Sequence, residues 1–135
     1  MTANAVPAID LLMVADWAEA VDGKLYLMGG GFTALVVDDP GQPSRFAVAA
    51  ILTVPTGYQG GLPLDAWLAE PSGQRLDGWE LHQDLTVGKP TERPGSIIVA
   101  GPVAVRFPTY GEVLVHMSFG DAQRSTSFRT VPRQA

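Results

Sequence analysis

The stretch VDGKLYLMGGGFTAL, from Val21 to Leu35, decides the fold class, because glycines after an apolar run occur both in phosphate-binding loops and in bent strands. A phosphate-binding loop needs a helix directly after its glycines, with the N-terminal N–H groups of that helix facing the anion. The residues that follow Gly29–Gly31 are FTALVV, a run typical of a strand, and no lysine follows the glycines. We therefore predict that the glycines bend a strand and that this stretch binds no nucleotide.

Glycine and proline punctuate the whole chain, which also favours short strands. The fifteen glycines and eleven prolines lie between short apolar runs instead of in one linker, and both residues break helices. Four stretches have apolar runs or alternation typical of strands or hairpins: Arg45–Pro55, Leu62–Glu70, Trp79–Val87 and Val113–Val131. We predict one all-β domain over residues 1–135, an antiparallel β-sandwich of about eight strands with a Greek-key, immunoglobulin- or C2-like topology.

Three finer predictions concern single segments. Arg45–Pro55 is apolar on both alternating faces, as expected of a central strand that is covered on both sides. Gly88–Gly95 is predicted to be a loop, because its two prolines exclude helix and interior strand. The pair Gly101-Pro102 predicts a bend between two separate strands.

The segment Pro7–Val21 fits two patterns. Its leading proline suits the first turn of a helix, and apolar residues recur at helical spacing along the segment. Strict alternation from Ile9 to Trp17 fits equally well, and a helix would leave no clean polar face. Asp22-Gly23 before KLYLM is a strong signal for a hairpin turn. The pattern favours a strand, and a helix remains the alternative.

The composition excludes several function classes. The chain has no cysteine, which excludes disulfides, thiolate catalysis and cysteine-ligated metal sites. Its net charge of −5 argues against a general affinity for nucleic acid or anionic membranes. The first residues lack the basic and apolar regions of a signal peptide, and no apolar run is long enough to span a bilayer. We expect a cytoplasmic protein that needs no cofactor.

The segment LLMVADWAEAVDGKLYLMGGGF, Leu11 to Phe32, resembles the N-terminal signature of a family of small bacterial proteins known only as a domain of unknown function. The positions that match the turns and strand ends of that family are Ala15-Asp16, Gly23-Lys24-Leu25, Gly29 to Phe32, Tyr110-Gly111 and Phe128-Arg129. The middle of this chain is richer in glycine than the family pattern. The resemblance implies an all-β sandwich and a strand at Pro7–Val21. It implies no activity, because none is established for the family.

Two histidines raise the question of a metal or catalytic site. His82 and His116 lie on the more polar faces of predicted strands, where Glu80 or Asp84 would complete a zinc or iron site if the strands were neighbours. No short-range ligand spacing accompanies them, so the sequence favours surface histidines. No nucleophile elbow is present, and the scattered serine, histidine and aspartate residues indicate no triad. We therefore assign no catalytic, cofactor or metal residue.

Asp16 is an acid beside a strongly apolar strand. A carboxylate in such a place must find hydrogen-bond donors or remain exposed. We expect Asp16 to make a structural bond to the turn amides near Gly23, or an ion pair with an arginine such as Arg129. A catalytic role for Asp16 is the less favoured alternative.

Aromatic residues indicate one further binding surface. Sandwich proteins bind sugars or peptides with exposed tryptophans, and the candidates here are Trp67, Trp79 and Tyr58. Core packing is nevertheless favoured for each tryptophan taken singly. Acids concentrate in the first forty residues and arginines in the C-terminal hairpin, which suits either self-association or internal ion pairs.

Taken together, these patterns predict a non-enzymatic protein-interaction or assembly module that binds a protein partner, a second copy of itself included. The alternative is a ligand-binding module for a glycan or peptide that uses the three aromatic candidates. A metal-dependent or hydrolytic enzyme is the third and least favoured hypothesis.

Overall fold

Residues 6–87 and 95–133 are described by the structure, a computed structural model, and every regular element in these ranges is a strand. The described chain has ten strands, more than the eight or so predicted, because segments as short as three residues also pair. The strands are β1 (Ala8–Ala15), β2 (Trp17–Val21), β3 (Lys24–Met28), β4 (Ala34–Val36), β5 (Ser44–Val54), β6 (Gly60–Ala69), β7 (Arg75–Val87), β8 (Gly95–Val105), β9 (Gly111–Phe119) and β10 (Ala122–Val131).

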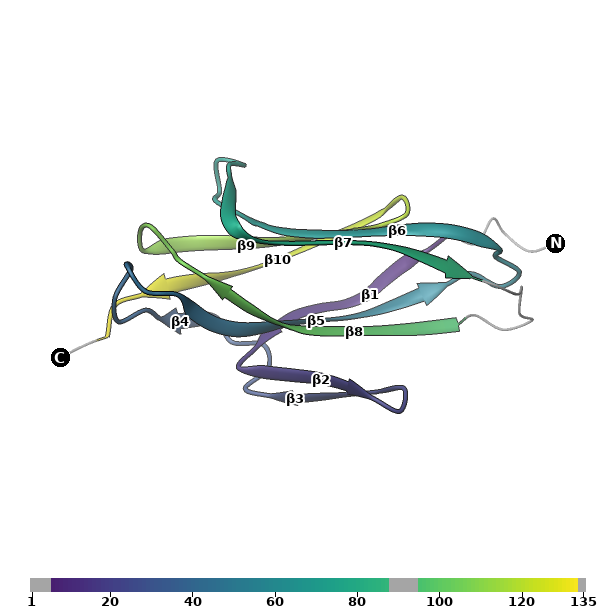
Figure 1. The fold of residues 1–135 in the computed structure, drawn as a ribbon, viewed down its shortest axis with the longest axis horizontal. Helices are drawn as coiled ribbons and strands as arrows, with labels where there is room; N and C mark the ends of the chain where they lie inside the picture. Colours follow the sequence, from purple (N-terminus) through teal and green to yellow (C-terminus); the bar gives the residue numbers. More distant parts are fainter. Residues whose placement is uncertain (1–5, 88–94, 134–135) are drawn as a thin grey trace.

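The strands form three layers (Figure 1). A five-stranded sheet has the order β4-β10-β9-β6-β7, and a three-stranded sheet has the order β1-β5-β8. The hairpin β2-β3 is a third layer on the outer side of the smaller sheet, where β2 contacts β8 and β5. The pairs are antiparallel except that of β4 with β10, which is parallel. The predicted sandwich is therefore confirmed, with a mixed sheet and an added hairpin.

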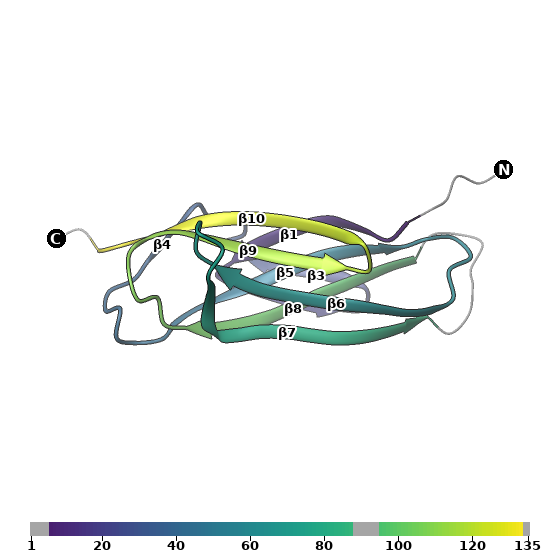
Figure 2. The ribbon, with the colours of Figure 1, turned by 90° about the horizontal axis from the view of Figure 1, so that it is seen from above.

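The core lies between the two large sheets, which Figure 2 shows one behind the other. Phenylalanines cross this gap: the ring of Phe128 on β10 lies 5.2 Å from that of Phe46 on β5 and 6.0 Å from that of Phe107. The opposite face of β5 is also buried, since Ala47 and Ala49 are 3% and 0% exposed beneath the hairpin layer. The prediction of a central strand covered on both sides is confirmed.

The glycine run returns the chain from the hairpin to β1. Gly29 and Gly31 have φ angles of 63° and 73°, in the left-handed region that favours glycine. The N–H of Asp16 donates to Met28 O at 2.9 Å, and the N–H of Gly31 donates to Val14 O at 2.7 Å. The next regular element is β4, a strand, so the prediction that the glycines bend an extended chain is confirmed.

The segment Pro7–Val21 is extended, as its alternation predicts, and it divides at Asp16 into β1 and β2. The hairpin turn at Asp22-Gly23 is also confirmed, because both residues have positive φ, as a type I′ turn requires. No helix in the described ranges is long and apolar enough to cross a membrane.

The predicted bend at Gly101-Pro102 is wrong. β8 continues through both residues, with Gly101 opposite Val48 and Pro102 opposite Ala47. A proline is tolerated there because β8 is an edge strand, whose outward-facing backbone groups pair with no other strand of residues 6–87 and 95–133. The loop predicted at Gly88–Gly95 lies outside the described residues, except for Gly95, which begins β8.

Candidate functional site

The outer face of the five-stranded sheet, which we call the sheet face, carries both histidines. His82 Nδ1 lies 2.5 Å from Asp65 Oδ1 across the β7–β6 pair, and His116 Nδ1 lies 2.6 Å from Ser125 Oγ across the β9–β10 pair. The hydrogen bond to Asp65, together with the negative charges of Asp65 and Asp84, raises the pKa of His82 above its usual value. Each histidine therefore has a polar partner on the neighbouring strand.

In the structure, the two histidines are too far apart to bind the same metal ion. β6 lies between β7 and β9, so His82 and His116 are separated by two strand spacings, roughly 10 Å. Within residues 6–87 and 95–133, no group of three histidine, cysteine or acidic side chains is arranged to hold a metal ion. In the described part of the chain, no acid forms an ion pair with His116, so His116 and Ser125 lack the third member of a serine hydrolase triad.

Trp67 is held by its neighbours on the sheet face. The guanidinium carbon of Arg75 lies 4.2 Å from the centre of the Trp67 ring, and the His116 ring lies 5.5 Å from it. Arg75 also pairs with Glu80 at 3.3 Å. These contacts occupy much of the aromatic surface that a sugar would need for stacking.

The three aromatic candidates do not form one platform. Trp79 packs against the core from the inner face of β7, opposite to the face that carries Trp67. Tyr58, in the connection before β6, also packs against the core. Its hydroxyl donates to Gly61 O, at the start of β6, at 2.8 Å. The predicted ligand site of Trp67, Trp79 and Tyr58 is therefore dispersed over separate surfaces.

Asp16 and Arg129 are also apart. Asp16 is exposed at the junction of β1 and β2, and its carboxylate lies against Gly29 in the returning glycine run. Arg129 belongs to β10 in the five-stranded sheet, between Ala34 and Glu112. No ion pair joins Asp16 to Arg129 in the described part of the chain.

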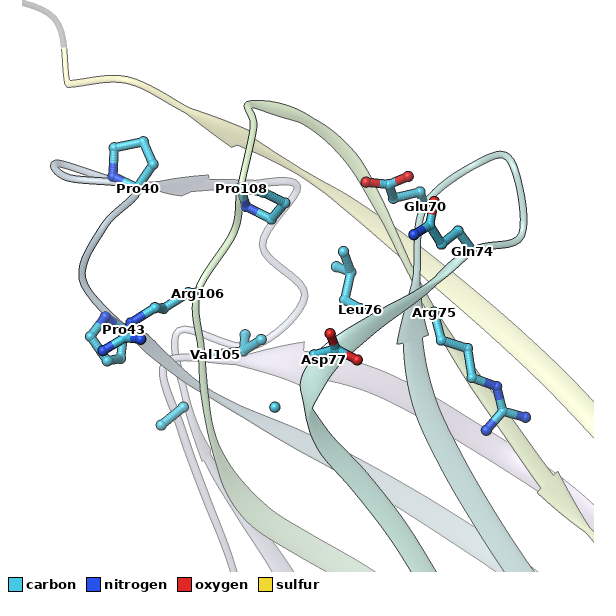
Figure 3. Close-up of a pocket in the computed structure, with 12 residues that line it drawn as sticks. Pro40, Pro43, Glu70, Gln74, Arg75, Leu76, Asp77, Val105, Arg106 and Pro108 are labelled. Atoms are coloured by element: carbon cyan, nitrogen blue, oxygen red, sulfur yellow. The ribbon is translucent and has the colours of Figure 1, made fainter.

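A pocket of about 650 Å³, which we call the end pocket, opens at one end of the sandwich (Figure 3). Leu76 and Val105 contribute apolar side chains to it, and Glu70 and Asp77 contribute carboxylates from the side of the β6–β7 turn. The other wall comes from the chain before β5 and from the end of β8, with Pro40, Pro43, Arg106 and Pro108. Arg75 extends away from the pocket in this view, toward the sheet face.

The outer side of the hairpin carries a cluster of exposed apolar residues that the sequence patterns did not indicate. Trp17, Val21, Tyr26 and Met28 are 45%, 38%, 47% and 65% exposed, and we call this surface the hairpin face. Trp17 lies opposite Met28, and Tyr26 lies opposite Glu19. The sequence did contain a usable pattern: the residues before and after the Asp22-Gly23 turn alternate. Once the strand register is known, this alternation puts the four residues on one face of the hairpin.

An apolar groove of about 450 Å³, which we call the edge groove, lies between the sheets where β7 and β8 are the edge strands. Trp79, Leu81 and Leu85 line it from β7, and Ile97 and Val99 line it from β8. None of the thirteen residues that line the groove carries a formal charge.

Comparison with known proteins adds information on the fold alone. No family model and no curated protein matches the chain. An immunoglobulin-like protein from Pseudomonas aeruginosa has 19% sequence identity and a TM-score of 0.50, over 96% of this chain and 100% of that one. The fold is immunoglobulin-like.

A second solved structure is of a longer protein, and this chain matches only one part of it. It is the alkylpurine DNA glycosylase AlkC from Pseudomonas fluorescens, bound to DNA containing an abasic site analog. Its identity is 12% and its TM-score 0.49, over 92% of this chain and 30% of the glycosylase. The resemblance to the uncharacterised bacterial family stays a prediction.

Proposed function

We propose that this protein is a non-enzymatic interaction module that binds a protein partner through the hairpin face. The observation that carries the proposal is the exposure of four large apolar side chains on a hairpin outside the sandwich core: Trp17, Val21, Tyr26 and Met28. Tryptophan, tyrosine and methionine are enriched at the buried centres of protein interfaces.

The surroundings of the hairpin face also suit a protein partner. Glu19 and Lys24 lie on the same face, opposite Tyr26 and Val21, so this face combines the apolar side chains with two charged groups. Charged groups beside apolar anchors give a protein interface specificity as well as affinity. On its other side the hairpin packs on the small sheet, where Ala18, Leu25 and Leu27 are half-buried, so the apolar outer face points away from the sandwich.

The absence of enzymatic activity is part of the same proposal. The side chains on the sheet face that could act as acids, bases or nucleophiles are paired with one another: His82 contacts Asp65, and His116 contacts Ser125. They lie on an exposed sheet surface: the His82 side chain is 65% exposed, and the hollow of about 360 Å³ beside His82 and Asp65 is open to water, which screens their charges. The predicted cytoplasmic location belongs to this proposal as well.

The test is capture of the partner from the cells in which the protein is made. Bait variants with Trp17→Ser, Tyr26→Ser and Met28→Ser together should lose the partner that the unaltered chain retains. The matched control replaces two exposed apolar residues elsewhere, Val6→Ser and Val36→Ser, and should retain it.

A second readout ties the captured partner to the hairpin face. In a chain with Trp67→Phe and Trp79→Phe, Trp17 is the remaining tryptophan, and its emission should shift to shorter wavelength when the purified partner binds. Retention of the partner by the triple hairpin variant, or an unchanged Trp17 spectrum at saturation, contradicts the proposal.

A further inference from the structure

The free edge of β8 has little protection against pairing with another strand. Among the described residues, β8 pairs with β5 on one side and with no strand on the other. From Gly95 to Val105 the strand contains no charged residue, and Ile97 to Gly101 are all half-buried. A long and apolar edge of this kind is a template for pairing with another strand.

The other edges of the two large sheets carry protection. On β1, the Arg124 guanidinium donates to the carbonyl oxygens of Ile9 and Asp10 at 3.0 and 3.2 Å, and Gly31 N–H donates to Val14 O. β4 has three residues.

β7, the edge strand above β8, is protected by charge and by irregularity. Its exposed residues include Asp77, Glu80, His82 and Asp84. Its pairing with β6 is interrupted between Trp67 and Ala69, next to a positive φ at Gly78. Charges, bulges and prolines keep edges from pairing. Between Gly95 and Val105, β8 has no charge and no break in its register with β5, and its one proline, Pro102, lies toward its C-terminal end.

The edge groove lies directly beside this free edge, because residues of β7 and of β8 line it. Side chains on the inner face of β8, at Ile97 and Val99, form one wall of it, and Gly101 contributes no side chain to the same wall. A strand added to β8 would therefore place alternate side chains in the mouth of the groove, as in recognition by strand addition.

The sequence of β8 is complementary to itself under a two-fold axis at Val99. Antiparallel pairing with a second β8 then puts Val99 opposite Val99, and Ile97 opposite Gly101. On the other face, Ile98 stands opposite Ala100. Each large side chain meets a small one, while Val99 meets its own copy, so the cross-strand contacts fill space without overlap.

Pro102 limits the length of this pairing and shows which backbone groups of β8 face the open edge. A proline inside a sheet turns its nitrogen away from the existing ladder, here away from β5. Backbone groups alternate along a strand, so the N–H and C=O groups of Ile98 and Ala100 also face the open edge. Those groups are the donors and acceptors that a second copy would satisfy.

We propose that this protein forms a two-fold homodimer in which β8 pairs antiparallel with β8 of a second copy, closing both edge grooves. The dimer has a continuous six-stranded sheet, with the order β1-β5-β8 in each half. This surface is separate from the hairpin face, which remains free for a different partner.

Sedimentation velocity of the full chain over a range of concentrations tests the proposal. The unaltered protein should sediment as a dimer. Ala100→Pro removes one edge-facing N–H without removing a bond to β5, and should shift the equilibrium to monomer at least tenfold. Ala104→Pro makes the same change on the same strand beyond the paired stretch, and should leave the dimer intact.

A disulfide provides an independent measurement. The chain has no cysteine, so Val99→Cys introduces a single thiol. Opposite residues of a non-hydrogen-bonded antiparallel pair have Cα atoms about 4.5 Å apart, within the range of a disulfide. Mild oxidation should crosslink this variant into a dimer, whereas Ser127→Cys, which is exposed on β10 of the other sheet, should remain a monomer on a non-reducing gel.

Two outcomes would overturn the dimer. One is a monomer at every concentration, and the other is a dimer in which Val99→Cys crosslinks no faster than Ser127→Cys. Neither result bears on the hairpin face, since the triple hairpin variant should still dimerise and Ala100→Pro should still capture the partner.

Discussion

Single residues in this protein take their roles from neighbours that are distant in the sequence. Gly29 is an example: its φ of 63° favours glycine, and a Cβ added there would overlap the carboxylate of Asp16. Gly31 has a similar φ of 73°, yet nothing lies near the place that its Cβ would occupy. The same backbone conformation therefore carries a packing restriction at one glycine and none at the other.

Gly29→Ala should lower the free energy of unfolding more than Gly31→Ala does. Both substitutions place alanine in the left-handed region, which costs about 1–2 kcal/mol. Gly29→Ala must in addition displace the Asp16 side chain. Urea denaturation measures both, and Asp16→Ala should remove the difference in a double-mutant cycle. Equal losses for the two alanine variants would contradict this account.

His82 should titrate above its ordinary pKa of 6.5, because the hydrogen bond to Asp65 and the charges of Asp65 and Asp84 favour its protonated form. A histidine whose pKa is higher in the folded state stabilises the fold below its unfolded pKa. That contribution is lost as the pH rises through the folded pKa. The ring proton signals of His82 in an NMR titration measure the shift.

Asp65→Asn is the matching variant, and it should move the pKa of His82 back toward 6.5. His116→Gln assigns the signals, since the chain has two histidines. An unchanged His82 titration in Asp65→Asn would mean that the bond to Asp65 does not form in solution.

At the scale of elements, the hairpin β2-β3 explains why the middle layer contains so much alanine. Ala15 and Ala49 are fully buried, and Ala47 is 3% exposed, on the face of the three-stranded sheet that the hairpin covers. Small side chains allow a second layer to approach closely. The sequence indicated that β5 is covered on both sides, but the hairpin as its cover followed only from the tertiary contacts.

Ala49→Leu should therefore lower the free energy of unfolding by about 1–3 kcal/mol, the usual cost of overpacking a filled site. Ala104→Leu is the control, because Ala104 lies on the same face of β8 but is exposed, and its effect should stay within about 0.5 kcal/mol. Thermal or urea unfolding measures both. A neutral Ala49→Leu variant would show that the hairpin does not pack on this sheet in solution.

At the scale of the whole molecule, two sheets share one core and leave surfaces of different character. The sheet face is polar, with histidines, serines and charged residues that bond to one another. The hairpin face exposes four large apolar side chains, and the edge strand β8 contains no charged residue. This division directs both proposals toward the small sheet and its hairpin.

The sequence by itself determined that this protein is built from short strands, where many of them lie, and that the glycine run bends the chain. These properties are local, because alternation, turn residues and chain breakers act within a few positions. The sequence also predicted which face of a strand is exposed to solvent. On β7 this prediction is confirmed, because Glu80, His82 and Asp84 are exposed.

Only the tertiary structure decided which surfaces meet. It separated Trp67 from Trp79, kept Asp16 away from Arg129, put the hairpin over the alanines of β5 and left the edge of β8 open. The order of strands in a sheet depends on pairings between segments far apart in the chain, and no local pattern contains them. The sequence pattern of a strand such as β8 is the same at the edge of a sheet as in its middle. Its capacity to pair with a second strand was therefore visible only in the fold.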